Sequence, residues 1–283
     1  MLGWCILIAI VNNYMTLELR SSWSENLQAS SPDVVVLPSA AEVDKYAFDI
    51  VTRVITEKPN AVLTLATGSS PLGLYNLMID AYRQNRLDMS GLTTRNLDEY
   101  WPLSKDHPQS YSRFMRDNLF NHVNIPEDQR FIPDSTADDP EMEMLRYQLI
   151  LEKTGPSDLA IIGIGPELTC HIAFNERGSS PDSRARLVQI DPVTIKANSR
   201  FFDGDESKVP HLAMTQGIAD ILESKEILLI AKGEGKARGI ARALMGPISS
   251  DAPASYLRLH PKVTFVIDRE AGSLLGNGFG ELI

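Results

Sequence analysis

The chain has 283 residues, of which 43% are hydrophobic and 23% charged, as in a soluble globular protein with a substantial core. Its net charge of −10 argues against a general nucleic-acid binder, which would show a basic face. An anionic substrate is not excluded, because surface charge is screened over about 8 Å at physiological salt, but it would need local cations. Two cysteines, Cys5 and Cys170, are too few for a disulfide-stapled secreted domain.

Residues 1–32 precede the regular pattern of the chain. Leu2 to Val11 are almost entirely apolar, but this run is too short to cross a bilayer, which needs about twenty residues. A signal peptide would require a basic residue before its apolar run, but none precedes Leu2. We expect a non-core N-terminal extension on a cytoplasmic protein without stable membrane association. Export or membrane anchoring is the alternative.

Strand-like and helix-like segments alternate from Asp33 onward. The β-branched run Val34 to Leu37 predicts a strand. Ser39 predicts a helix N-cap, with Glu42 at the third helical position. The next elements expected are a strand at 61–66 and a helix at 72–86.

The turn between those two elements is Thr67-Gly68-Ser69-Ser70-Pro71. A strand, then glycine and small hydroxyl residues, then a helix start brings free backbone N–H groups and the positive helix end together. Ser69 and Ser70 could add hydroxyl donors to a phosphate. The turn is not a P-loop, because the G-x-x-x-x-G-K-[ST] spacing is absent. A simple capped helix start is the alternative interpretation.

Two adjacent acids, Asp98 and Glu99, end the segment that begins at Leu92. Adjacent acids usually form a solvated face. One of them could instead be a general base in a partly apolar pocket, and the residues alone do not choose between the two. Helices are expected further on at 110–120 and 142–153.

The stretch from Asp158 to Glu176, DLAIIGIGPELTCHIAFNE, joins a buried strand to two reactive side chains. Leu159 to Ile162 is a continuous apolar run followed by glycine, which is typical of a central parallel strand covered on both faces. Ligand chemistry in open α/β sheets collects at the carboxyl ends of strands. His171 and Glu176 follow such an end, which makes them candidate catalytic residues.

Three more strands complete the pattern. They are expected at 187–190, 226–231 and 263–268, and the second leads through KGEGK (232–236) into a helix at 237–245. Strands alternating with helices of about 10–15 residues favour an α/β fold with an open, mostly parallel sheet and helices on both faces. Since no linker or repeat interrupts the pattern, we expect one domain at 33–283.

Several motifs together resemble one family, the glucosamine-6-phosphate deaminases, also called glucosamine-6-phosphate isomerases. They are LATGSSPLGLY (65–75), NLDEYWPLSKDHPQSYSRFM (96–115) and HIAFNE (171–176), with NSRFFD (198–203), GEGKA (233–237) and SYLRLHPKVTFVID (255–268) in matching order. The resemblance covers about residues 33–270. It implies a fold of the modified Rossmann type and no metal or organic cofactor. The implied reaction converts glucosamine 6-phosphate and water to fructose 6-phosphate and ammonia.

The resemblance also implies a role for each matched residue. Asp98 would move a proton from C2 to C1 of the sugar. His171 would open the pyranose ring, since histidine titrates in the useful range, and Glu176 would orient and polarise it. The phosphate of this small-molecule substrate would be held by Gly68, Ser69, Ser70, Arg200 and Lys236. Hexamers occur in the family, so a homo-oligomer stays open.

The loop before His171 departs from the family pattern G-x-G-x-[DN]-G-H. Here it reads GIGPELTCH (163–171), two residues longer and with Cys170 in place of the glycine, which has easier access to positive φ. Counting back from His171 puts Thr169 at the family's acid position, whereas counting forward from Gly165 puts Glu167 there. Because that acid helps hold the histidine, its loss predicts an impaired or altered enzyme, or one in which Glu167 takes over.

Two further departures are single residues. Arg177 gives FNERG rather than the family's usual FNEPG. Val188 stands where allosterically activated members have a basic residue shortly after S-R-x-R, here Ser183 to Arg186. This argues against activation by N-acetylglucosamine 6-phosphate.

Two other functions stay open. A regulatory sugar-phosphate binder could keep the phosphate site after the altered 166–170 loop had removed turnover. A 6-phosphogluconolactonase-like hydrolase would share the fold, but that sister family is not expected to carry the DEY…HPxSY and HIAFNE strings.

Overall fold

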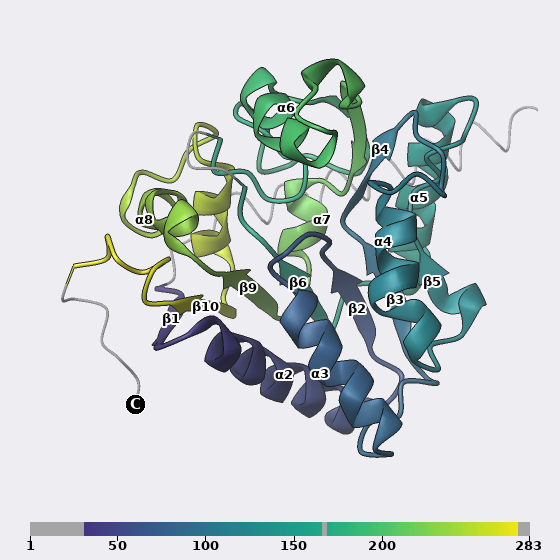
Figure 1. The fold of residues 1–283 in the computed structure, drawn as a ribbon, viewed down its shortest axis with the longest axis vertical. Helices are drawn as coiled ribbons and strands as arrows, with labels where there is room; N and C mark the ends of the chain where they lie inside the picture. Colours follow the sequence, from purple (N-terminus) through teal and green to yellow (C-terminus); the bar gives the residue numbers. More distant parts are fainter. Residues whose placement is uncertain (1–30, 166–168, 277–283) are drawn as a thin grey trace, which may run out of the picture.

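A parallel sheet of seven strands lies at the centre of the computed structural model, which describes residues 31–165 and 169–276 (Figure 1). All neighbouring strands of this sheet run parallel. This confirms the predicted α/β fold with an open, mostly parallel sheet. In spatial order the strands are β1 (Asp33–Leu37), β10 (Val263–Asp268), β9 (Ile227–Ala231), β6 (Leu159–Ile162), β2 (Val62–Leu65), β3 (Thr93–Asn96) and β5 (Arg130–Phe131).

The central strand β6 faces a different hydrophobic core on each side. Leu159 and Ile161 pack on one face of the sheet, with α2 (Ala40–Glu57), α3 (Leu72–Arg83) and α4 (Tyr111–Asn118). Ala160 and Ile162 pack on the other, with α7 (Ile218–Leu222), α8 (Ala237–Met245) and η6 (Pro253–Leu259). Since β6 is buried on both faces, its sequence is apolar at every position, as the sequence predicted.

A second, antiparallel sheet was not predicted from the sequence. Its three strands lie in the order β4 (Asp98–Trp101), β8 (Leu212–Thr215) and β7 (Arg186–Gln189). One face packs on α5 (Pro140–Thr154), and the other packs on α6 (Pro192–Asn198). The sequence indicated a strand near β7. It did not distinguish β4 from β3, because a single residue separates the two strands and they resembled one segment.

Helix starts follow their sequence signals more closely than helix ends do. Ser39 Oγ accepts the N–H of Glu42, which confirms the predicted N-cap, and the same hydroxyl donates to the Glu42 carboxylate. The helix expected at 72–86 ends at Arg83. The one expected at 110–120 ends at Asn118 and is followed by the short 3₁₀ turn η1 (Phe120–His122). The remaining turns are η2 (Glu127–Gln129), η3 (Ser199–Phe201), η4 (Glu206–Lys208) and η5 (Glu234–Lys236).

The predicted N-terminal extension falls almost wholly on residues 1–30, which lie outside the described residues. Across 31–165 and 169–276, none of the helices combines the length and the apolar character needed to cross a membrane.

Candidate active site

The predicted site residues follow different strands at one edge of the parallel sheet. β2 leads into Gly68–Ser70, β6 leads toward His171, and β9 leads into η5 (Figure 1). The strand order reverses between β2 and β6, since the chain continues from β2 to β3 and β5 on one side and from β6 to β9 and β10 on the other. Ligands bind in the crevice at such a reversal. A Cβ placed on Gly163 would lie 3.9 Å from Ser70 Oγ, so the loops after β2 and β6 meet there.

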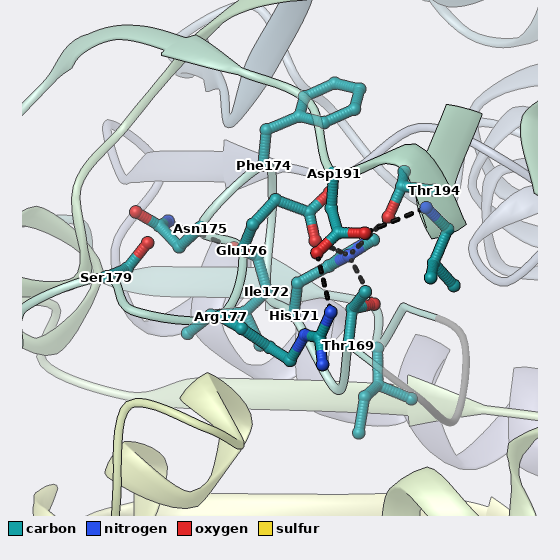
Figure 2. Close-up of polar contacts among 12 residues, drawn as sticks. Thr169, His171, Ile172, Phe174, Asn175, Glu176, Arg177, Ser179, Asp191 and Thr194 are labelled. Carbon is teal, nitrogen blue, oxygen red and sulfur yellow. Dashed lines mark hydrogen bonds and ion pairs between the residues drawn. The ribbon is translucent and has the colours of Figure 1, made fainter.

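The His171 imidazole has three side-chain oxygens around its Nδ1 atom (Figure 2). Glu176 Oε2 and Thr169 Oγ1 each lie 2.9 Å from Nδ1, and Thr194 Oγ1 lies 3.5 Å from it. Only 12% of the His171 side chain is exposed. A carboxylate on Nδ1 fixes the tautomer and leaves Nε2 to exchange a proton with a ligand.

The backbone around His171 adopts an uncommon conformation. Cys170 and Ala173 have φ values of 48° and 50°, in the left-handed region, which costs an L residue about 1–2 kcal/mol. Cys170 therefore occupies a conformation that glycine would adopt at lower cost. Gly165 makes room for the ring, because a Cβ at that position would lie 2.2 Å from Nε2 of His171.

Asp98 and Glu99 start strand β4 and have different environments. Glu99 is fully buried, and its carboxylate accepts the N–H groups of Tyr100, Tyr111 and Ser112 and the hydroxyl of Ser110. Two of these N–H groups open helix α4, so Glu99 caps that helix. Asp98 is buried too, but no group in the described part of the chain donates a hydrogen bond to its carboxylate. Burial, and secondly the charge of Glu99, raise the pKa of Asp98 to about 8.

Thr215 connects Asp98 to the His171 loop. It is the residue of β8 that pairs with Asp98 of β4, and its hydroxyl accepts the N–H of Phe174 at 3.2 Å. Phe174 in turn lies on the loop between His171 and Glu176, with its ring centroid 6.4 Å from that of the imidazole. The strand partner of Asp98 is therefore hydrogen-bonded to the loop that carries His171.

The turn after β2 offers uncapped backbone donors. Gly68 has a φ of 90°, which only glycine adopts readily, and it turns the chain from β2 toward α3. Ser69 is exposed and Ser70 is half-buried. Pro71 at the N-cap of α3 makes no side-chain capping bond, so the first N–H groups of this helix have no side-chain acceptor there. An anion at this turn would meet hydroxyl and amide donors together.

Two cations, Lys236 and Arg200, lie near enough to influence one another. Lys236 Nζ donates to the carbonyl oxygen of Ile164, on the loop after β6, at 2.6 Å. Burial first, and the positive charge of Arg200 second, lower the pKa of Lys236 to about 8. Arg200 is exposed, with its guanidinium carbon 4.6 Å from the centroid of the Phe201 ring. An anion between the two cations would relieve their repulsion.

Two residues near His171 were not predicted. Thr194 lies in the first turn of α6, and Asp191 is the N-cap of this helix, where it accepts the N–H of Val193 at 2.8 Å. The pair Asp191-Pro192 is a recognisable helix start, but no local pattern indicates which loop the helix contacts. Glu167, the alternative to Thr169, lies outside the described residues.

The site combines groups suited to proton transfer on an anionic ligand. It has a histidine–carboxylate pair, a buried carboxyl group with a raised pKa, two cations near one another, and a helix start without a side-chain cap. Within the described residues, no cluster of three or more His, Cys, Asp or Glu side chains is arranged to hold a metal ion.

Comparison of the sequence with known proteins gives matches over most of the chain. A profile of the family described as glucosamine-6-phosphate isomerases/6-phosphogluconolactonase matches residues 38–266. The glucosamine-6-phosphate deaminase of Thermoanaerobacter pseudethanolicus is 45% identical over 242 residues, which are 86% of this chain and 94% of the relative. That of Halothermothrix orenii is 43% identical over 242 residues, which are 86% and 99% of the two chains.

Solved structures give the same picture. A monomeric glucosamine-6-phosphate deaminase superposes with a TM-score of 0.82 at 42% identity, covering 86% of this chain and 99% of its own. The 6-phosphogluconolactonase of Trypanosoma brucei superposes with a TM-score of 0.69 at 19% identity, covering 86% and 98% of the two chains. The second likeness is one of fold alone.

Proposed function

The chain belongs to the family of glucosamine-6-phosphate isomerases and 6-phosphogluconolactonases, and within it we propose that the chain is a glucosamine-6-phosphate deaminase. The reaction takes glucosamine 6-phosphate and water to fructose 6-phosphate and ammonia. It has three stages: opening of the sugar ring, transfer of a proton from C2 to C1, and hydrolysis of the imine at C2.

Ring opening falls to His171. The bond between C1 and the ring oxygen breaks as Nε2 gives a proton to that oxygen, and the C1 hydroxyl loses its proton to water as the aldehyde forms. Glu176 on Nδ1 stabilises the charged imidazole and holds its orientation. The hydroxyl of Thr169 occupies the neighbouring position on the same nitrogen.

Proton transfer between C2 and C1 falls to Asp98. The carboxylate takes the proton from C2, and the electrons move to form an enolamine as the aldehyde oxygen takes a proton from water. The same group then returns the proton to C1, which leaves an imine at C2. Water adds to the imine carbon and ammonia departs. A raised pKa makes Asp98 a stronger base than an exposed aspartate, and it accepts no hydrogen bond from a described group that would weaken it.

The phosphate binds at the other end of the site. We assign it to the turn Gly68–Ser70 at the start of α3, with Lys236 and Arg200 as its cations. An acidic protein with a net charge of −10 needs such a local cluster to hold an anion.

The observation that carries the proposal is the buried Asp98 carboxyl, which has no hydrogen-bond donor among the described residues and whose strand partner Thr215 is hydrogen-bonded to the loop of the His171–Glu176 pair. The test is ammonia release from glucosamine 6-phosphate by the wild-type chain and by Asp98→Asn, with calorimetric binding of fructose 6-phosphate to both. We expect release by the wild type and loss of release, with retained binding, in Asp98→Asn.

Two alternative functions have their own readouts. Binding of the sugar phosphate without ammonia above the Asp98→Asn background would identify a regulatory homologue. Hydrolysis of 6-phosphogluconolactone without ammonia release would identify a lactonase, for which the likeness to a solved lactonase at 19% identity supports the fold only.

Assembly and location stay predictions. The solved relative at 42% identity is described as monomeric, whereas the sequence left a homo-oligomer open. Light scattering coupled to size-exclusion chromatography decides between them, and fractionation of cells tests the expected cytoplasmic location.

A further inference from the structure

A buried ion pair joins helix α2 to the connection that follows β9. Lys232 is the first residue after β9, and its Nζ donates to Oδ1 of Asp44 on α2 at 2.6 Å. Only 16% of the Lys232 side chain and 13% of the Asp44 side chain are exposed. Such a pair holds its geometry, because separating the partners would leave a buried charge without compensation.

Asp44 also lies against the start of α3. A Cβ placed on Gly73, the second residue of that helix, would lie 1.9 Å from Oδ2 of Asp44. Any larger residue at position 73 would therefore displace the carboxylate. The negative charge also suits this place, because the first turn of a helix carries a partial positive charge. Asp44 thus contacts the helix start that directly follows the turn Gly68–Ser70.

The connection after β9 is fixed at a second point before it reaches Lys236. Gly233 has a φ of 87°, which glycine adopts readily, and its N–H donates to both carboxylate oxygens of Asp268 at 3.0 Å. Lys236 ends the short turn η5, and its Nζ donates to the carbonyl oxygen of Ile164. The contacts of Lys232 and Gly233 therefore fix the backbone from which Lys236 extends.

The strand order explains why a link at this place matters. The turn Gly68–Ser70 follows β2 and Lys236 follows β9, but β6 lies between these two strands in the sheet. The pairing of the sheet therefore relates the two strands through β6. Asp44 contacts both sides more directly, at Gly73 on the helix after the turn and at Lys232 on the connection after β9.

We propose that Asp44 and Lys232 are positioning residues for the substrate phosphate, which set the spacing between the turn Gly68–Ser70 and the Lys236 ammonium. This inference rests on the proposed function, since it takes the phosphate to bind between those two groups. Because the ion pair is neutral as a whole, Lys232 adds no net attraction for an anion. Of the two lysines in KGEGK (232–236), Lys236 is the one that attracts the phosphate.

Loss of either partner should weaken phosphate binding without slowing the chemistry. Asp44→Asn and Lys232→Met each break the pair, so the start of α3 and the connection after β9 lose their common anchor. We expect the Kd for fructose 6-phosphate and the KM for glucosamine 6-phosphate to rise roughly fivefold to tenfold, with kcat within about twofold of the wild type. The double variant should bind no more weakly than the single variants, because the same interaction is missing in all three.

Direct binding of the phosphate by Lys232 predicts a different pattern. Asp44→Asn would then release a cation to the phosphate and tighten binding, whereas Lys232→Met would weaken it. Changes of Kd in opposite directions would therefore overturn the positioning role, and changes in the same direction that do not add would support it.

The matched control is Glu226→Gln. Glu226 immediately precedes β9, as Lys232 immediately follows it, and its Oε2 lies 2.6 Å from Nζ of Lys262. The Glu226 side chain is 8% exposed, so this change also breaks an ion pair of a buried charge, but at the opposite end of the strand. It should lower stability and leave the Kd for fructose 6-phosphate unchanged. A loss of binding as large as that of Lys232→Met would overturn the proposal, because any destabilisation would then weaken the site.

A third variant, Gly73→Ala, tests the same contact without removing a charge. Alanine favours a helix more than glycine does, but its Cβ would displace the Asp44 carboxylate. This variant should also raise the Kd for fructose 6-phosphate, and it keeps the proposal falsifiable if a charge variant fails to fold.

The experiment is calorimetric titration of the whole chain and its variants with fructose 6-phosphate, beside steady-state assays of ammonia release from glucosamine 6-phosphate. Equal Kd values in the wild type and the folded variants would overturn this inference, and ammonia release would still uphold the proposed function. Weakened binding in the variants of a chain that releases no ammonia would sink the proposed function and leave this inference standing. A wild type that binds no fructose 6-phosphate would overturn both.

Discussion

Glu99 accepts four hydrogen bonds, whereas Asp98, the residue before it on β4, accepts none from the described residues. Both carboxyl groups are buried. The difference separates a group that holds the structure together from one whose burial destabilises it. A stability measurement can therefore distinguish the two acids that the sequence pattern could not.

Asp98→Asn should abolish ammonia release, with a loss of about a thousandfold or more in kcat, and should also stabilise the chain. The raised pKa of Asp98 means that the folded state binds its proton more tightly than the unfolded state does. Stability from this group is therefore lost as the pH rises from about 4 to about 8. At pH 8 the variant should unfold with a free energy higher by up to about 5 kcal/mol, and the gain should vanish near pH 4. Urea denaturation at both values checks this, and a less stable variant at pH 8 would contradict it.

Glu99→Gln should have the opposite effect on stability. It replaces an acceptor-only carboxylate with an amide whose NH2 group cannot accept from the N–H groups at the start of α4. We expect a loss of roughly 2 kcal/mol in the free energy of unfolding. A variant as stable as the wild type would show that Glu99 does not cap this helix.

The pH dependence of kcat/KM should be a narrow bell centred near pH 8. Asp98 must lose its proton to act as a base, so activity rises as the pH passes about 8. Lys236 must keep its proton to attract phosphate, and its pKa is also about 8. KM should therefore increase as the pH rises above 8. Binding of fructose 6-phosphate to Asp98→Asn should retain only the alkaline limb. A flat binding profile from pH 7 to 9.5 would contradict the role of Lys236.

Thr169→Val should reduce kcat/KM more than Thr194→Val does. Both changes remove a buried hydroxyl near Nδ1 of His171, but Thr169 lies at 2.9 Å and Thr194 at 3.5 Å, the limit of a hydrogen bond. We expect losses of roughly tenfold and roughly twofold. Steady-state assays of ammonia release compare the two variants. Equal losses would contradict a stronger hydrogen bond from Thr169 than from Thr194 to His171.

Cys170→Gly should be more stable than Cys170→Ala by about 1 kcal/mol. Both variants lose the thiol, which is buried and donates to the carbonyl of Gly239 at 3.3 Å. They differ in tolerance of the φ of 48°, which favours glycine. Thermal denaturation of the two variants gives the difference, and an alanine variant of equal stability would show that the loop relaxes.

Features decided by neighbouring residues were predictable from the sequence. The apolar run of β6 implies burial on both faces, and Ser39 before an apolar helical pattern implies an N-cap, because each depends on residues close together in the chain. The pairing of Asp98 with Thr215 was not predictable, since nothing near either residue specifies the other. The contact of α6 with His171 has the same character.

The loop at 163–171 shows a further limit of assigning positions by counting residues. Its length made Thr169 and Glu167 equal candidates for the position beside the histidine. The structure places Thr169 Oγ1 on Nδ1 because Cys170 adopts a left-handed φ, which turns the chain back toward the ring. Sequence spacing does not encode such a turn when a cysteine occupies it.

The reversal of strand order has a practical consequence for protein engineering. The connections that carry Gly68, His171 and Lys236 each leave a different strand, and the interstrand ladder beneath them contains none of these residues. One connection can therefore be exchanged as a cassette while the ladder keeps its pairing. Transplanting a seven-residue G-x-G-x-D-G-H segment in place of 163–171 would place the acid and the glycine of the family pattern in an otherwise unaltered scaffold.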